Sequence, residues 1–267
     1  MSLRSDVETL FSKHVFEFIG GANFHALESG QASREDYTRF IENVTRAHLK
    51  SPQLLAFLFA LAPPDVADDL AHNILKELSP KKDSDGAPSS LLKQLAVGAG
   101  LAPRLPELKA LAADDIRQLI VDPLLHDSIK EVGLAVLCEV TACEFMLIGV
   151  AGRIVQALAL HCGLGPTTLE WFTHHSEADI QHAEQGLDNL MSYIRYHKFN
   201  ETDALTTIEM TLGENIFIKR YFDTQSFGRV TAEVARRNWL LQRSTHPTSL
   251  LPRFLSTAPE SRHFAIR

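Results

Sequence analysis

The residues that most directly suggest chemistry are His175, Asp179 and His182, which follow one another at helical spacing. Because an α-helix turns by about 100° per residue, the three side chains fall within about 60° of one another on one stripe of a helix. Two imidazoles and a carboxylate in a line form a donor set that suits iron, manganese or zinc. The pattern predicts metal ligands, and its alternative is an ordinary polar helix edge in contact with solvent.

A second informative feature is the almost uninterrupted apolar run from residue 133 to residue 160. A helix that is apolar all round is expected in the centre of a fold. The run contains Glu139 and Glu144, and burying a carboxylate without a partner is costly. A metal ion or a cationic side chain would remove this cost, so both glutamates are candidate ligands. They lie about 140° apart around the helix, so we expect one ion to bind only one of them.

The composition is that of an ordinary soluble globular protein, with 45% apolar and 22% charged residues among 267. Two glutamates near the middle of the apolar run argue against a membrane span, and no signal peptide is evident. The three cysteines form neither a disulfide framework nor a Cys-x-x-Cys metal pair. These features predict a cytoplasmic protein that does not interact with membranes.

The charge is unevenly distributed along the chain. The whole chain has a net charge of −7, whereas residues 227–267 carry seven arginines against two glutamates, so residues 1–226 carry −12. An acidic body does not favour nucleic-acid binding. We therefore predict two parts: a helical domain at residues 1–226 and a basic, partly ordered C-terminal extension at residues 227–267.

Helical signals run through the whole predicted domain. Ser33 and Asp36 are typical of a capping box that opens a helix. A further helix is expected at residues 66–78, where spacing places Glu77 beneath the apolar stripe. No segment shows the sustained alternation of a β-strand, so the predicted fold class is an all-α multi-helix bundle. The other long helices are predicted at residues 54–61, 133–160, 167–196 and 202–222.

These segments resemble the haem-oxygenase-like superfamily of helical proteins, which includes TenA thiaminases, the PqqC oxidase and CADD-like diiron oxidases. The resemblance covers about residues 20–222. Its most specific part is Trp171-Phe172-(x2)-His175-(x3)-Asp179-(x2)-His182-Ala183, which looks like the iron-binding signature of the diiron branch. The apolar helix ending in Cys162-Gly163-Leu164 resembles the family's central glutamate helix, and Phe24-His25-Ala26-Leu27 resembles part of its opening helices. The resemblance implies a haem-oxygenase-like bundle.

In the diiron branch, a carboxylate and a histidine from an earlier helix complete the site. The resemblance therefore implies the ligands Glu77, Glu144, His175, Asp179 and His182. Glu139 is the alternative to Glu144: the spacing of Glu144 to His175 resembles CADD-like members, whereas the residues before Glu139 resemble haem oxygenase itself. The family histidine has no match, because no histidine lies between residues 73 and 125. Its candidate replacements are Asp85, His48 and His126.

The resemblance implies an oxidoreductase that uses one or two iron ions and O₂ to oxidise a small organic substrate. The ligand set would also accept manganese or zinc. Thiamin hydrolysis is disfavoured because Leu147 stands where TenA thiaminases have a tyrosine near their cysteine, here Cys143. A ferritin-like bundle is disfavoured because the predicted helical domain, residues 1–226, contains no Glu-x-x-His motif.

Two other functions stay open on the same scaffold. One is a metal-free, TenA-like or PqqC-like enzyme or ligand-binding module, in which His175, Asp179 and His182 bind a substrate or act as acid and base. The other is an inactive interaction protein. A homodimer is the default expectation for any oligomer.

Overall fold

The structure is a computed structural model and describes residues 2–78, 88–214 and 219–222. Within these ranges every regular element is a helix, which confirms the predicted all-α fold. The side chains of residues 76–78, 88–89 and 176–182 are not described. The predicted extension at residues 227–267 and the candidate ligand Asp85 also lie outside the described residues.

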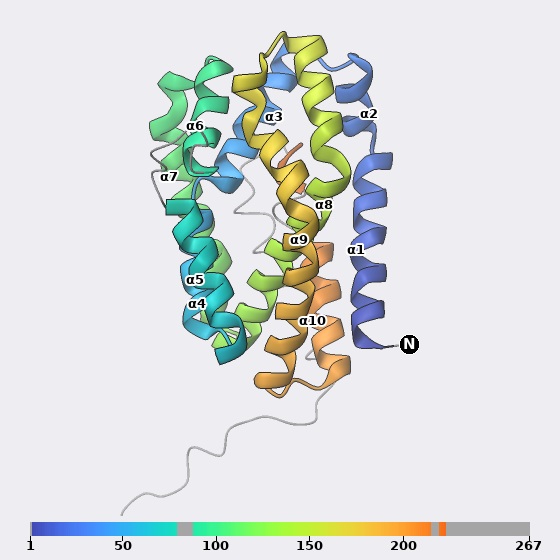
Figure 1. The fold of residues 1–267 in the computed structure, drawn as a ribbon, viewed down its shortest axis with the longest axis vertical. Helices are drawn as coiled ribbons and strands as arrows, with labels where there is room; N and C mark the ends of the chain where they lie inside the picture. The colour runs from blue at the N-terminus through green and yellow to red at the C-terminus, as the bar shows by residue number, and fades with distance from the viewer. Residues whose placement is uncertain (1, 79–87, 215–218, 223–267) are drawn as a thin grey trace, which may run out of the picture.

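The described residues form ten α-helices, arranged as a bundle around two long central helices (Figure 1). The helices are α1 (Leu3–Gly20), α2 (Ala22–Ser29), α3 (Arg34–His48), α4 (Ser51–Leu61), α5 (Pro64–Leu78), α6 (Pro88–Gly98), α7 (Leu105–Ile116), α8 (Ile129–Cys162), α9 (Pro166–Tyr196) and α10 (Glu201–Gly213). Three shorter helical segments lie between α6 and α8, at Ala102–Arg104, Arg117–Val121 and Pro123–Leu125.

Local sequence signals determine where several helices begin and end. The predicted capping box is present at the start of α3, where the Asp36 amide donates to Ser33 Oγ (3.1 Å) and the Ser33 amide donates to Asp36 Oδ2 (3.0 Å). Gly163 has a φ of 67° and ends α8 in the left-handed conformation that glycine tolerates best. The helix predicted at residues 202–222 is shorter, because α10 ends at Gly213, and glycine is a poor helix former.

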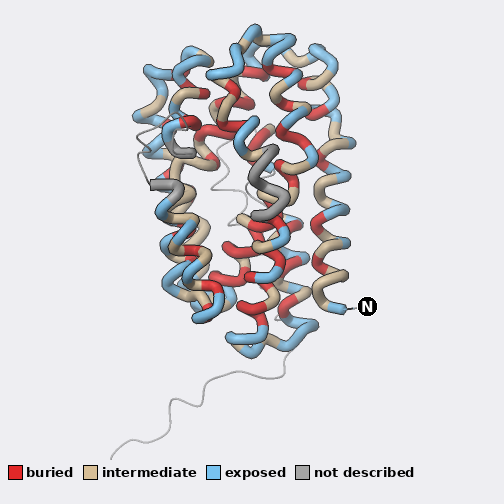
Figure 2. The backbone as a smooth tube through the Cα atoms, viewed as in Figure 1, coloured by how far each residue is buried: buried red, intermediate tan, exposed pale blue. Residues whose placement is uncertain are grey.

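The core is built around α8 and α9, whose short connection at residues 163–165 makes them antiparallel neighbours. Buried segments are concentrated on the inward-facing sides of the helices (Figure 2). Helix α8 is long and apolar enough to cross a membrane, and 67% of its most apolar 18-residue window is buried inside the structure. This burial is what we expect of the central helix of a bundle.

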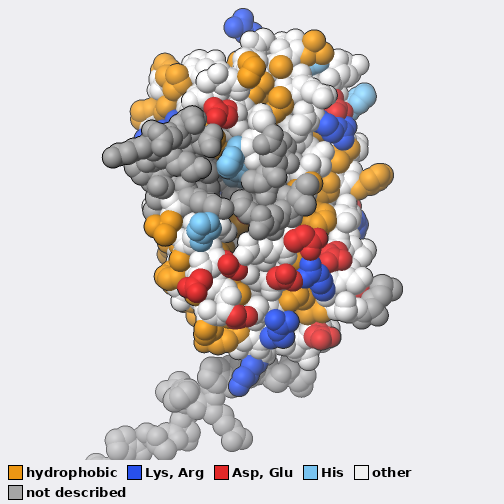
Figure 3. Space-filling model, in the orientation of Figure 1, with side chains coloured by type: hydrophobic (Ala, Val, Ile, Leu, Met, Phe, Trp, Pro, Cys, Tyr) orange, Lys and Arg blue, Asp and Glu red, His pale blue; other side chains and the backbone are white. Residues whose placement is uncertain are grey.

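Charged side chains of both signs lie on the outer surface of α9 and its neighbours (Figure 3). Arg4 of α1 forms ion pairs with two acidic residues of α9, Glu184 (2.7 Å) and Asp188. These pairs connect the first helix of the chain to one of the central helices. Since all three side chains are partly or largely exposed, the pairs contribute little to stability.

Helices α8 and α9 approach closely where Gly186 faces Thr141. A Cβ atom built on Gly186 would lie 2.8 Å from Cγ2 and 3.0 Å from Oγ1 of Thr141, which is too close for unstrained packing. A Cβ atom built on Gly152, which also lies within α8, would have no neighbouring atom within 4 Å. The two glycines therefore form a matched pair in similar helical backbone.

We expect Gly186→Ala to lower the free energy of unfolding by about 1–2 kcal/mol, because the new methyl group pushes α8 and α9 apart. Gly152→Ala should raise it by up to about 1 kcal/mol, because alanine is the better helix former. Urea titration followed by circular dichroism measures both changes. Equal stabilisation by the two substitutions would contradict the close approach of the helices.

Candidate metal centre

His175 lies near the middle of α9, which is helical through the whole of the predicted ligand pattern. Its ring atom Nδ1 is 2.7 Å from the backbone carbonyl oxygen of Trp171. A carbonyl oxygen only accepts hydrogen bonds, so Nδ1 carries the proton and donates it. The lone pair of the neutral ring is then on Nε2. Metal-binding histidines are commonly oriented by such a bond from their other nitrogen, so the described geometry fits a ligand.

Three other predicted ligands have a described backbone without a described side chain. Glu77 lies in the last turn of α5, and Asp179 and His182 lie in α9. Among the described residues, no group of three or more His, Cys, Asp or Glu side chains could hold a metal ion. This finding covers only one member of the His/Asp/His pattern, so the predicted ligand set stays a prediction.

The stripe that carries the predicted ligands continues to Gly186. Gly186 follows His182 by four residues and lies within about 40° of it around α9. Since Gly186 packs directly against Thr141 of α8, helical periodicity predicts that this stripe of α9 faces α8. A carboxylate from α8 is therefore well positioned to join the stripe if it lies near Thr141 on the same side of that helix.

The two candidate glutamates of α8 differ in their position relative to Thr141. Glu144 is about 60° from Thr141 around the helix, whereas Glu139 is about 160° from it. Because α8 and α9 run antiparallel past the Thr141–Gly186 contact, Glu144 is level with about residue 183 and Glu139 with about residue 188. Glu139 is buried at 4% exposure and Glu144 is partly buried. The helix geometry favours Glu144 as the partner of the α9 stripe.

The described residues of α9 form an amphipathic helix. His174 is exposed, whereas the neighbouring His175 is partly buried. Phe172, which continues the ligand stripe, is fully buried, and so is Leu190 at its other end. The described apolar residues of the helix's inner face, Ala183, Leu187, Leu190 and Ile194, are all buried.

A second histidine, His48 at the end of α3, lies close to His175. The ring centroid of His48 is 4.8 Å from that of Trp171, and the Trp171 centroid is 4.1 Å from that of His175. Nε2 of His48 is 2.6 Å from the hydroxyl of Tyr221. Burial lowers the pKa of His48 to about 3, with smaller contributions from His175 and Arg220, so this imidazole is neutral at neutral pH.

His48 is one of the candidate replacements for the missing family histidine, and the structure places it beside His175. His126 is exposed and follows the short segment Pro123–Leu125. The sequence places His48 on the inward face of its helix, and it contains no signal that connects His48 to Trp171 or Tyr221. Those contacts join segments that are far apart in the chain.

A buried ion cluster lies next to this histidine and has no counterpart among the sequence predictions. The carboxylate of Asp115, which is 3% exposed, accepts hydrogen bonds from Arg46 Nε (2.7 Å) and Nη2 (2.6 Å) and from Arg220 Nη1 (2.6 Å). The cluster connects α3, α7 and residues 219–222. Because Arg220 precedes Tyr221, it helps to hold Tyr221 against His48.

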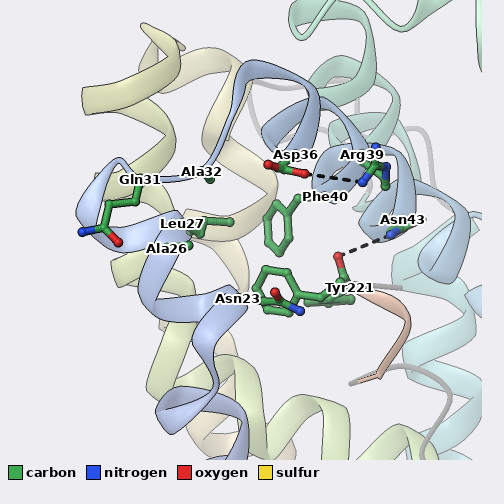
Figure 4. Close-up of a pocket in the computed structure, with 11 residues that line it drawn as sticks. Asn23, Ala26, Leu27, Gln31, Ala32, Asp36, Arg39, Phe40, Asn43 and Tyr221 are labelled. Carbon is green, nitrogen blue, oxygen red and sulfur yellow. Dashed lines mark hydrogen bonds and ion pairs between the residues drawn. The ribbon is translucent and has the colours of Figure 1, made fainter. Parts of the chain in front are cut away.

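A pocket of about 220 Å³ lies between α2, α3 and residues 221–222 (Figure 4). Its lining combines aromatic rings with side-chain amides and one ion pair, Asp36 with Arg39. Tyr221 belongs to both places, because it is one of the residues that line the pocket and its hydroxyl bonds His48. Of the predicted ligands whose side chains are described, which are Glu139, Glu144 and His175, none lines this pocket. The pocket is next to the candidate metal centre at Tyr221. The aromatic and amide residues are Phe40, Tyr221, Phe222, Asn23, Gln31 and Asn43.

Comparison with known proteins identifies the family. Residues 38–212 match the model of a haem-oxygenase-like family that is described as iron-containing redox enzymes. The match extends from α3 to α10, so it includes His48, both glutamates of α8 and the whole pattern on α9. A search of curated proteins finds no match. Since the family model covers more than half of an all-helical chain, the protein belongs to the haem-oxygenase-like family of iron-containing redox enzymes.

Proposed function

We propose that the protein is a non-haem iron oxidase or oxygenase that uses O₂ to oxidise a small organic substrate. Membership of an iron-containing redox family supports the general class of reaction. The observation that carries the more specific proposal is the orientation of His175. Its Nδ1 proton is held by the Trp171 carbonyl oxygen, so Nε2 is the nitrogen that can bind a metal, on a stripe of α9 that faces α8.

The proposed ligands combine imidazole nitrogen and carboxylate oxygen, which suit Fe(II) and would also accept manganese or zinc. Bound iron would supply redox chemistry and a coordination position for O₂. The proposal includes one or two ions, because the family histidine is absent. The ligands are Glu77, Glu144, His175, Asp179 and His182.

The chain's own side chains have three roles in this proposal. The carbonyl of Trp171 holds the proton on Nδ1 of His175 and fixes the orientation of the ring. Phe172 and Leu147, exposed by 0% and 1%, form an apolar wall that excludes water. His48 adds a neutral imidazole beside Trp171, so it places no further positive charge near the site at neutral pH.

The rival function is a metal-free enzyme or ligand-binding module, and the missing family histidine favours it. In that case His175 would hydrogen-bond a substrate or transfer a proton. Both functions predict that His175 is important, so loss of activity in a His175 variant does not separate them. Metal content does.

The deciding experiment is elemental analysis of protein that is purified anaerobically, loaded with Fe(II) and desalted. We expect about one or two irons per chain, where two would mean that the missing histidine has been replaced. His175→Ala and His182→Ala should lose the iron, and the matched control His174→Ala should keep it because His174 faces solvent. Circular dichroism verifies that each variant is folded. Wild-type protein without iron would overturn the proposal and favour the metal-free rival.

A further inference from the structure

Tyr221 differs from the other three tyrosines of the chain in what its hydroxyl contacts. Tyr196 is 55% exposed, and the buried Tyr37 and Tyr193 donate to backbone carbonyl oxygens at 2.7 Å and 3.1 Å. Tyr221 is fully buried, and its hydroxyl lies 2.6 Å from Nε2 of His48. An imidazole nitrogen readily accepts a proton, whereas a backbone carbonyl oxygen does not. The Tyr221 hydroxyl is therefore paired with a side chain that can take up its proton, and His48 does so in the tautomer whose lone pair is on Nε2.

The Tyr221–His48 pair continues as an aromatic chain toward His175. The ring centroids of Tyr221 and His48 are 5.8 Å apart, those of His48 and Trp171 are 4.8 Å apart, and those of Trp171 and His175 are 4.1 Å apart. Trp171 is also buried, at 2% exposure. The structure thus provides a short series of contacting rings between a buried phenol and the candidate metal centre.

We propose that Tyr221 is a redox-active residue that donates one electron through Trp171 to an oxidant at His175 and transfers its hydroxyl proton to His48. The O–H bond of Tyr221 breaks, which leaves a neutral tyrosyl radical and the imidazolium form of His48. The transferred electron lowers the oxidation state of the oxidant by one. In the cell, that oxidant would be the iron-based oxidant of the proposed function, on which this part of the inference rests.

The surroundings of His48 suit a reversible proton transfer. An oxidised phenol is a far stronger acid than imidazolium, so its proton moves across the 2.6 Å contact to His48. Reduction of the radical gives a phenolate, which is a stronger base than neutral imidazole, so the proton returns to Tyr221. The charged neighbours of His48 are Arg220 and Asp115. Asp115 forms ion pairs with Arg220 and with Arg46.

The pocket gives a small electron donor access to this residue. Tyr221 is one of the residues that line it, together with Phe40 and Phe222 (Figure 4). A phenol or an aromatic amine suits such walls, since its ring can pack against theirs and its hydroxyl or amino group can bond the amides of Asn23 or Asn43. Such a donor would reduce the Tyr221 radical and complete a route for electrons from the pocket to the metal centre.

The test uses metal-free, full-length protein, so its outcome does not depend on iron binding. A photogenerated ruthenium(III) complex serves as the one-electron oxidant, and electron paramagnetic resonance detects the tyrosyl radical. All variants carry Tyr196→Phe, which removes the exposed tyrosine. We expect a radical in this parent protein and in the matched control Tyr193→Phe, and its loss in Tyr221→Phe. The same radical in Tyr221→Phe, or none in the parent, would overturn the inference.

Two further measurements separate a redox role of Tyr221 from a structural one. In high-field spectra, a radical that is hydrogen-bonded to imidazolium has a shifted g value, and His48→Gln should abolish this shift. Added 4-methoxyphenol should shorten the lifetime of the radical, and Ala26→Phe, which fills the pocket, should slow this decay. A g value that is unchanged by His48→Gln would contradict the proton transfer. If the protein takes up no iron when loaded with Fe(II) but still forms this radical, the proposed function fails and the inference about Tyr221 stands.

Discussion

Asp115→Ala should lower the free energy of unfolding by about 3–5 kcal/mol, a large loss for a single substitution. The substitution leaves the guanidinium groups of Arg46 and Arg220 together without the carboxylate that holds both. The side chain of Arg220 is 3% exposed and that of Arg46 is 12% exposed, so water compensates poorly for the lost bonds. Urea titration of the variant measures the change.

The matched control for Asp115 is Glu35, which pairs with Arg39 on the surface of α3 at 2.9 Å. The Glu35 side chain is 81% exposed, so Glu35→Ala should change stability by less than about 0.5 kcal/mol. Asp115→Asn should fall between the two, because an amide oxygen still accepts a hydrogen bond but carries no charge. Similar small losses for Asp115→Ala and Glu35→Ala would mean that the buried cluster does not stabilise α3, α7 and residues 219–222.

The second large effect concerns iron rather than stability. Glu144→Gln should abolish iron binding or weaken it by more than the roughly 10–100-fold that follows loss of a residue that merely orients a ligand. Glu139→Gln should leave the iron content unchanged, because Glu139 lies about 160° around α8 from the Thr141 contact with α9. Elemental analysis after loading with Fe(II) measures both variants.

These two glutamates are each other's control, since both are acidic residues in the same helix. Iron loss in Glu139→Gln with retention in Glu144→Gln would reverse the assignment, and it would show that the ligand stripe of α9 does not face α8 as the Gly186 contact indicates. Loss in both variants would mean that the two carboxylates serve different ions. Circular dichroism and thermal unfolding confirm that each variant is folded.

The helical class and most of the helices could be predicted from the sequence because they depend on interactions between near neighbours. Apolar periodicity located α9, predicted at residues 167–196 and observed at Pro166–Tyr196. Side-chain capping located the start of α3 at Ser33. The helical spacing of α9 also accounts for the difference between exposed His174 and partly buried His175. All of these features are encoded within a few consecutive residues.

Contacts between residues that are far apart in the chain could not be predicted from the sequence and became known from the tertiary structure. The sequence leaves Glu139 and Glu144 as alternative ligands, and the contact between Thr141 and Gly186 shows that the two glutamates lie at different angles to the side of α8 that meets α9. The hydrogen bond between Tyr221 and His48 joins residues 173 positions apart, and Asp115 binds Arg46 and Arg220 across 69 and 105 positions. Local propensity carries no information about such pairings. They arise when the apolar faces of the helices are buried against one another and bring polar side chains from separate helices together.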